Sequence, residues 1–197
     1  MIRWCVFISG RGSNLAAAIE ECRETGPTIS LVFSSDDSAP GLAKARRAGI
    51  PTLVMPKIDH PTTGSGKQKI DWVALDKALR AARIDAIFLL GFMRIVPADF
   101  LERWSGRVWN LHPSLLPSFP GLRSIERAAM AKAPLGATIH VVEPEVDAGP
   151  IVKQTRVESR GAVLESVAAA EFFVHQVEQV LVRGMFSRLR TMEEGKG

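Results

Sequence analysis

Residues 3–14 read Arg-Trp-Cys-Val-Phe-Ile-Ser-Gly-Arg-Gly-Ser-Asn, and this order of residues decides the fold class. The apolar run 3–9 predicts a buried strand. The following Leu-Ala-Ala-Ala-Ile-Glu-Glu-Cys at 15–22 predicts a helix, with Ser13 or Asn14 available as its N-cap. A strand, a glycine-rich turn and a helix in direct succession are typical of the first half of a βαβ unit.

The same alternation continues along the chain. Further strands are predicted at 29–34, 51–54, 86–90 and 107–110, and helices at 41–48, 70–83 and 97–104. The last part contains a helix at 125–132, strands at 136–142 and 151–157, and a terminal helix at 162–190 broken at Gly184. The last strand is expected to be antiparallel because no helix precedes it. We therefore predict an α/β fold: a Rossmann-like, open, twisted and mostly parallel sheet, with helices on both faces and an antiparallel C-terminal strand.

The length of 197 residues suits a single domain. We assign residues 1–190 to that domain and 191–197 to a frayed C-terminal tail. The Gly/Pro/Thr-rich stretch 56–68, which includes His60, is predicted to be an exposed surface loop rather than a linker.

Composition argues against several classes of protein. The net charge of +4 comes from 25 basic residues scattered among 21 acidic ones, so no basic block predicts a nucleic-acid partner. Cys5 and Cys22 lack metal-ligand spacing, and the four histidines show no paired spacing on a helix, so no metal site is predicted. Because neither a signal peptide nor a membrane-length apolar run is present, we expect a cytoplasmic protein without a membrane partner.

The glycine-rich turn is a candidate anion site. Glycines let the backbone approach a ligand, and the first amides of a helix lack partners and attract negative charge. The turn at Gly12, Ser13 and Asn14 lacks the third glycine of the dinucleotide fingerprint, so we expect it to bind a phosphate. The alternative is an ordinary tight turn.

A second candidate site is the stretch 110–117, Asn-Leu-His-Pro-Ser-Leu-Leu-Pro. Alternation along a strand places Asn110 and His112 on the same side of the chain, and the prolines stiffen the loop that follows. A carboxylate near an imidazole favours its protonated form, and Asp147 in an acidic loop is the candidate. A protonated histidine and an amide donor suit a tetrahedral oxyanion, which favours acyl transfer to an amine without a covalent intermediate. The alternative is a structural histidine and a turn aspartate.

Five motifs in the chain occur in an order that resembles the 10-formyltetrahydrofolate-dependent formyltransferases, and among them the phosphoribosylglycinamide formyltransferases. They are Ile8-Ser9-Gly10-Arg11-Gly12-Ser13-Asn14-Leu15, Gly91-Phe92-Met93-Arg94-Ile95, Asn110-x-His112-Pro113-Ser114-Leu115-Leu116-Pro117, Gly136-x-Thr138-x-His140 and Asp147-x-Gly149-Pro150-Ile151. The resemblance covers about residues 2–185. It implies transfer of a formyl group from the co-substrate 10-formyltetrahydrofolate to glycinamide ribonucleotide in de novo purine biosynthesis.

The resemblance also implies a role for each matching residue. His112 would be the general acid, Asn110 would bind the formyl oxygen, and Asp147 would raise the pKa of His112 and organise a proton-shuttling water. Gly12, Ser13 and Asn14 would hold the substrate phosphate, and Glu171 would contact the ribonucleotide. The folate would be enclosed by two segments, Met93-Arg94-Ile95-Val96 and Glu143-Pro144-Glu145-Val146-Asp147. The peptide between Leu116 and Pro117 is expected to be cis.

Some positions depart from the family pattern. Ser34-Ser35, Arg123-Ser124-Ile125 and Phe172 replace residues common in the family, and the 56–68 stretch offers no match for its usual folate-contacting arginine, Gln68 being nearest by count. The alternatives are therefore another acceptor (an amino sugar nucleotide, methionyl-tRNA or water) or a catalytically silent ligand-binding homologue. The small-molecule substrates are the predicted partners, and the chain is expected to be a monomer or a homodimer.

Overall fold

The structure is a computed structural model that describes residues 2–25, 28–55, 70–158 and 166–194. The strands are β1 (Arg3–Ile8), β2 (Thr28–Ser34), β3 (Thr52–Val54), β4 (Ala86–Leu89), β5 (Val108–His112), β6 (Gly136–Val141) and β7 (Ile151–Arg156). The helices are α1 (Ser13–Thr25), α2 (Pro40–Arg47), α3 (Trp72–Ala81), α4 (Ala98–Arg103), α5 (Ser124–Met130) and α6 (Val167–Glu194). These elements alternate along the chain as the sequence predicts.

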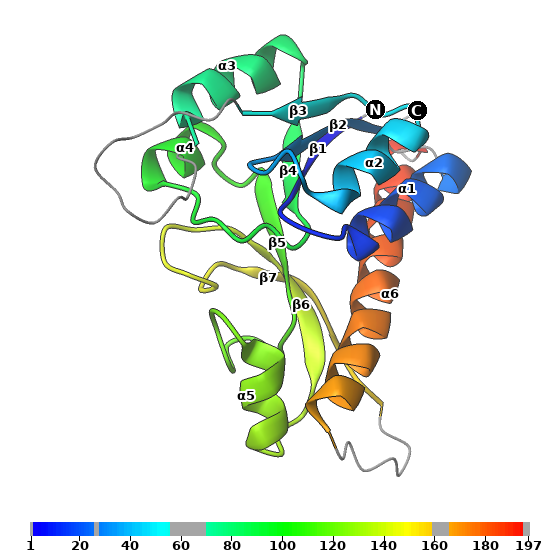
Figure 1. Cartoon of the computed structure of the whole chain (residues 1–197), viewed down its shortest axis with the longest axis vertical. Helices are drawn as coiled ribbons and strands as arrows, with labels where there is room; N and C mark the ends of the chain where they lie inside the picture. The colour runs from blue at the N-terminus through cyan, green and yellow to red at the C-terminus, as the bar shows by residue number, and fades with distance from the viewer. Residues whose placement is uncertain (1, 26–27, 56–69, 159–165, 195–197) are drawn as a thin grey trace.

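The strands form one twisted sheet in the order β3-β2-β1-β4-β5-β6-β7 (Figure 1). Neighbours from β3 to β5 pair in parallel, whereas β6 pairs antiparallel with both β5 and β7. The predicted mostly parallel sheet and the antiparallel pairing of the last strand are therefore confirmed. The strand that reverses direction is β6, and β7 runs in the direction of the parallel strands.

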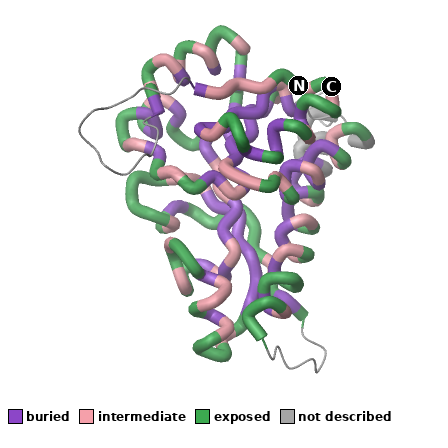
Figure 2. The backbone as a smooth tube through the Cα atoms, viewed as in Figure 1, coloured by how far each residue is buried: buried purple, intermediate pink, exposed green. Residues whose placement is uncertain are grey.

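Helices cover both faces of the parallel part of the sheet. Trp4, Val6 and Ile8 of β1 point to the face covered by α1, α2 and α6, and they join one buried cluster with Leu15, Leu42 and Val182. Cys5 and Phe7 point to the opposite face, where Leu75 of α3 and Phe100 of α4 complete a second cluster. Because both faces are packed, β1 and β4 are buried almost along their whole length (Figure 2).

The covering helices leave one part of the sheet without a helix. Leu111 of β5 and Ala137 and Ile139 of β6 pack into the cluster beneath α6. The alternate residues, Asn110, His112, Thr138 and His140, therefore face the other side, where α3 and α4 pack over β1, β4 and the start of β5. This part of the sheet carries the candidate site.

Three predicted details are wrong or untested. The carbonyl of Gly12 accepts the first helical hydrogen bond, from Ala16, so Gly12 rather than Ser13 or Asn14 is at the N-cap of α1. Helix α6 continues through Gly184 without a break and reaches Glu194, so the tail predicted to begin at 191 is helical up to that residue. The predicted loop at 56–68, with His60, lies outside the described residues.

Candidate active site

Three of the candidate segments follow the carboxyl ends of three neighbouring parallel strands. The glycine turn follows β1, the 91–96 turn follows β4, and the 113–123 loop follows β5. Strand order reverses between β1 and β4, since β2 and β3 lie on one side and β5 on the other. Open α/β sheets bind their ligands in the crevice at such a switch point. The topology therefore brings the predicted phosphate and reaction segments to one edge of the sheet.

The amide and the imidazole lie on the same side of β5, as the alternation predicts. Asn110 is the cross-strand partner of His140, and His112 is the partner of Thr138. The antiparallel reversal of β6 thus brings a second histidine beside the predicted pair.

Asp147 reaches these side chains from the loop between β6 and β7. Its backbone has a φ of 56°, a left-handed conformation that aspartate tolerates better than most residues. Two residues later, a Cβ on Gly149 would lie 2.0 Å from the carbonyl oxygen of Val141. Glycine at this position therefore allows the loop to fold back on β6 and carry the carboxylate over the sheet.

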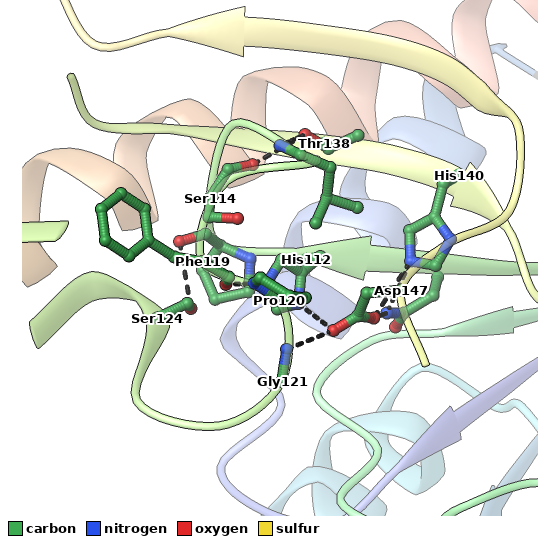
Figure 3. Close-up of polar contacts among 12 residues, drawn as sticks. His112, Ser114, Phe119, Pro120, Gly121, Ser124, Thr138, His140 and Asp147 are labelled. Atoms are coloured by element: carbon green, nitrogen blue, oxygen red, sulfur yellow. Dashed lines mark hydrogen bonds and ion pairs between the residues drawn. The ribbon is translucent and has the colours of Figure 1, made fainter. Parts of the chain in front are cut away.

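The carboxylate of Asp147 is the centre of the polar network (Figure 3). Its Oδ2 lies 3.2 Å from His112 Nδ1 and accepts a hydrogen bond of 2.7 Å from the backbone amide of Gly121. Its Oδ1 lies 3.4 Å from both His140 Nε2 and Asn110 Nδ2. The His112 and Asp147 side chains are only 7% and 10% exposed, so water screens their interaction weakly. The structure brings all three predicted catalytic residues together.

Both ring nitrogens of His112 face oxygen acceptors. Nε2 lies 3.1 Å from the backbone carbonyl oxygen of Phe119, and Nδ1 faces Asp147. Only the imidazolium form can donate at both positions. Burial nevertheless dominates and lowers the pKa of His112 below its ordinary value of 6.5, although the Asp147 charge and the Phe119 carbonyl raise it. The predicted contribution of Asp147, which raises the pKa of His112, is confirmed, but burial outweighs it.

At Asp147, the interactions that favour the charged form outweigh the effect of burial on the pKa. Burial raises its pKa, but hydrogen bonds from His140 and the Gly121 amide, together with the charge of His112, lower the pKa below its ordinary value. The site therefore keeps a carboxylate anion beside two imidazoles. His140 itself is fixed at Nδ1, which lies 2.8 Å from the backbone oxygen of Val141.

The loop after His112 is tied to the sheet by the buried hydroxyl of Thr138. This hydroxyl donates to the Ser114 carbonyl at 2.7 Å and accepts from the Leu116 amide at 3.2 Å. Gln154 of β7 donates both to Thr138 Oγ1 and to the Leu116 carbonyl. The peptide between Leu116 and Pro117 is cis, as expected. These contacts fix the start of the loop whose carbonyl at Phe119 meets His112.

The glycine turn has the geometry of a backbone anion site. Gly12 has a φ of +65°, and a Cβ there would lie 2.9 Å from the Cα of Gly41 at the start of α2. Lys44 Nζ donates to the Gly12 carbonyl at 3.2 Å, which adds positive charge near the turn. The amides of Ser13 and Asn14 precede the first helical hydrogen bond, so helix geometry gives them no partner within α1. The buried Oδ1 of Asn14 has no hydrogen-bond partner. Phosphate binding here stays a prediction.

The predicted folate segments lie around an exposed apolar rim. Met93 and Ile95 after β4 are 67% and 79% exposed, and Val146 in the acidic loop is also exposed. Val142 at the start of that loop packs against the cluster that contains Phe92 and Val96, so the two segments approach each other. Exposed apolar side chains grouped in this way often mark a ligand-binding surface. The side chain of Val96 belongs to the core, so only its backbone is left to contact a ligand.

Sequence similarity places the chain among known proteins. The family model described as formyl transferase matches residues 2–178. The chain belongs to the formyl transferase family. Phosphoribosylglycinamide formyltransferase of Haemophilus influenzae is 36% identical over 160 residues, which are 80% of this chain and 73% of that protein. The chain in the crystal structure of phosphoribosylglycinamide formyltransferase from Brucella melitensis is 35% identical in sequence to this chain. The two structures superpose with a TM-score of 0.82, and the match covers 96% of this chain and 95% of that one.

Other relatives of this formyl transferase are much longer. The human trifunctional purine biosynthetic protein adenosine-3 is 42% identical over 159 residues, or 79% of this chain. This chain spans only 11% to 16% of the length of the animal trifunctional proteins that it matches. Each of these longer proteins is similar to this chain over only one segment of its own length.

Sequence reasoning missed two parts of this formyl transferase site. His140 belongs to one of the five family motifs, but no role in the site was predicted for it, although its alternation with Thr138 and the neighbouring strand at 107–110 place it beside Asn110. The carbonyl of Phe119 carries no side-chain signal, and its contact with His112 depends on a loop conformation in which Phe119 has a φ of 55°. Within the described residues, no group of three or more potential metal ligands occurs and no helix could cross a membrane.

Proposed function

We propose that this chain transfers the formyl group of 10-formyltetrahydrofolate to the amine of N1-(5-phosphoribosyl)glycinamide, a step of de novo purine biosynthesis. The observation that carries the proposal is the buried His112–Asp147 pair beside Asn110, at the same edge of the sheet as the glycine turn. Relatives named phosphoribosylglycinamide formyltransferase support the choice of acceptor.

The two proposed substrates bind at different parts of the same edge of the sheet. Gly12, Ser13 and Asn14 hold the phosphate of the ribonucleotide, and Glu171 at the start of α6 contacts its sugar or glycinamide part. The folate lies along residues 93–96 and 143–147, where the exposed Met93, Ile95 and Val146 offer apolar contacts to its flat ring. The formyl group then lies at Asn110 and His112, at the end of β5.

The proposed chemistry is a direct attack on the formyl carbon. The glycinamide nitrogen forms the new C–N bond, and the formyl oxygen becomes an oxyanion that Asn110 and protonated His112 stabilise. The bond to N10 of the folate then breaks, the attacking nitrogen loses a proton, and N10 gains one. A water held by Asp147 can carry that proton. Burial lowers the pKa of His112 below its ordinary value, so the imidazolium gives up its proton readily.

The proposal requires an exchange of hydrogen bonds on substrate binding. Asn110 Nδ2 contacts Asp147 and His140, while His112 Nε2 faces the Phe119 carbonyl. Asp147 holds Nδ1 of the ring, so the Phe119 carbonyl at Nε2 is the contact that a substrate oxygen can replace. The formyl oxygen would take the place of this carbonyl at Nε2.

A transfer assay tests the proposal. Purified protein and 10-formyltetrahydrofolate are combined with glycinamide ribonucleotide, methionyl-tRNA or an amino sugar nucleotide, and each formylated product is quantified by mass spectrometry. We expect a formylated ribonucleotide and loss of about 100-fold or more in rate for His112→Ala. Formylation of another acceptor, or release of formate alone, would overturn the assignment of the acceptor. Folate binding without turnover would indicate a silent homologue.

A further inference from the structure

Ser9 follows β1 directly and bonds to the turn that follows β4. The two strands are parallel neighbours at the switch point of the sheet. Beyond their last pair, the backbone amide of Ser9 donates to the Gly91 carbonyl at 3.2 Å, and the Ser9 hydroxyl accepts from the Met93 amide at 2.9 Å. One residue therefore joins the end of β1, which leads into the glycine turn, to the predicted folate segment 93–96.

The folate segment has few other anchors. Phe92 and Val96, on either side of residues 93–95, are buried and pack into the core beneath α3 and α4. Among the residues that the structure describes, the backbone of 93–95 makes a single hydrogen bond, from the Met93 amide to Ser9. Packing thus fixes the two ends of this stretch, and the Ser9 hydroxyl fixes the backbone between them. The remaining amides and carbonyls of 93–95 are left to pair with a ligand or with water.

The glycine turn has anchors of its own. The Gly10 carbonyl accepts from the Gly41 amide at the start of α2, at 3.1 Å. The Gly12 carbonyl accepts from Lys44 Nζ at 3.2 Å. Neither contact uses the Ser9 side chain. Loss of the Ser9 hydroxyl should therefore displace the folate segment and leave the glycine turn in place.

We propose that Ser9 is a positioning residue for the formyl donor, because its hydroxyl holds the Met93 amide and so sets the backbone of 93–95 against the folate ring. This inference rests on the proposed function, in which the folate lies along residues 93–96. A segment that is already ordered costs less to fix when the ligand binds, and this raises affinity. Ser9 itself touches no reacting atom.

The test uses Ser9→Ala, which removes the acceptor of the Met93 amide. We expect the KM for 10-formyltetrahydrofolate to rise about fivefold, the size of one ordinary hydrogen bond. The kcat and the KM for glycinamide ribonucleotide should stay within about twofold. Ser105→Ala, at an exposed serine after α4, is the matched control and should leave every constant unchanged. An unchanged KM for the donor, or equal rises in both KM values, would overturn the inference.

Two further variants separate the hydroxyl from a purely structural role. Ser9→Thr keeps a hydroxyl and should restore the KM for the donor; a loss equal to that of Ser9→Ala would overturn the role of the hydroxyl. Ser9→Cys carries a group of similar size that accepts weakly, and it decides the matter if Ser9→Ala does not fold. A lower free energy of unfolding in Ser9→Cys with a wild-type KM for the donor would show that Ser9 serves the fold alone.

Failure of the proposed function has a different signature. If the wild-type protein formylates no ribonucleotide, calorimetry with the oxidised analogue 10-formylfolate tests the inference by binding alone. Binding about fivefold weaker in Ser9→Ala than in wild type would support the role of Ser9 even though the acceptor is wrong. Equal binding by both proteins would overturn the inference, and a wild type that binds no folate would overturn both the inference and the proposed folate site.

Discussion

His112 Nδ1 lies 3.2 Å from Asp147 Oδ2, and the two side chains come from opposite ends of the antiparallel unit formed by β5, β6 and the loop after β6. The carboxylate also accepts from the Gly121 amide, so one side chain links the loop after β5 to the loop after β6. Asp147 therefore both tunes the imidazole and fixes the loops that surround it.

Asp147→Asn should lower kcat by about 100-fold or more with little change in the KM for either substrate. The amide removes the negative charge that favours protonated His112, although it can still accept from Gly121. Steady-state kinetics measure the effect, and Asp99→Asn is the control, because Asp99 is an exposed carboxylate on α4 that pairs with Arg103. A wild-type kcat in Asp147→Asn would remove Asp147 from the catalytic set.

The pKa of His112 should lie below the ordinary histidine value of 6.5, and the pKa of His175 should lie above it. Burial lowers the pKa of His112, whereas the bond to Glu178 raises the pKa of His175. Imidazole resonances followed by NMR between pH 5 and 8, and assigned with single-histidine variants, measure both values. In Asp147→Asn the pKa of His112 should fall further, because the carboxylate contribution that raises it is gone. A pKa of His112 above 6.5 in the wild type would contradict this balance.

The same shifts predict how stability depends on pH. The folded state disfavours the proton on His112, so its stabilising contribution is present above pH 6.5 and is lost as the pH falls through the lower folded pKa. The contribution of His175 has the opposite sign: it is present below pH 6.5 and is lost as the pH rises through the raised folded pKa. Urea unfolding at pH 5.5 and 7.5 should therefore show a smaller acid-induced loss of stability in His112→Asn, and a larger one in His175→Asn, than in wild type.

The sequence was sufficient for the parts of the site that depend on strand geometry. Alternation placed Asn110 and His112 on one side of β5, and the glycine turn was located at the end of β1 because a strand and a helix flank it directly. Contacts between loops cannot be predicted from the sequence in the same way. The approach of Asp147 depends on a left-handed backbone at that residue and on the space left by Gly149, which no periodicity encodes.

The errors have equally local causes. Gly184 was expected to break the terminal helix, yet α6 continues through it, because the residues on either side pack into the core. Val182, Met185 and Phe186 are all buried, and their packing outweighs the cost of about 1 kcal/mol for a glycine in a helix. The predicted effect of Asp147 on the pKa of His112 is correct, but the sequence does not show how deeply the ring is buried, and burial makes the net shift downward.

Gly149→Ala should lower both stability and activity. A Cβ would lie 2.0 Å from the Val141 carbonyl oxygen, so the loop must move away from β6 and take Asp147 with it. We expect a loss of about 1–3 kcal/mol in the free energy of unfolding and a fall in kcat that approaches that of Asp147→Asn. Gly106→Ala is the control, because its φ of +69° makes it strained while nothing lies within 4 Å of the new Cβ. That variant should lose stability but keep kcat; equal kcat values in the two variants would show that Gly149 does not position Asp147.

Thr138→Val should test whether the sheet positions the catalytic loop. The substitution keeps the shape of the fully buried side chain but removes a hydroxyl that bonds to Ser114, Leu116 and Gln154. Leaving these buried partners unsatisfied should cost about 1–3 kcal/mol in the free energy of unfolding, measured by urea denaturation. Because the same loop carries the carbonyl of Phe119 to His112, we also expect kcat to fall while the KM for the ribonucleotide changes little.

The matched control for that variant is Thr155→Val on the neighbouring strand β7, where the side chain is partly exposed. It should leave both stability and kcat close to the wild-type values, since a β-branched residue is retained on a strand. If Thr138→Val lost stability with an unchanged kcat, the hydroxyl would serve the fold alone, and the loop geometry at His112 would have to be maintained by the Ser114–Ser118 and Gly121–Asp147 hydrogen bonds instead.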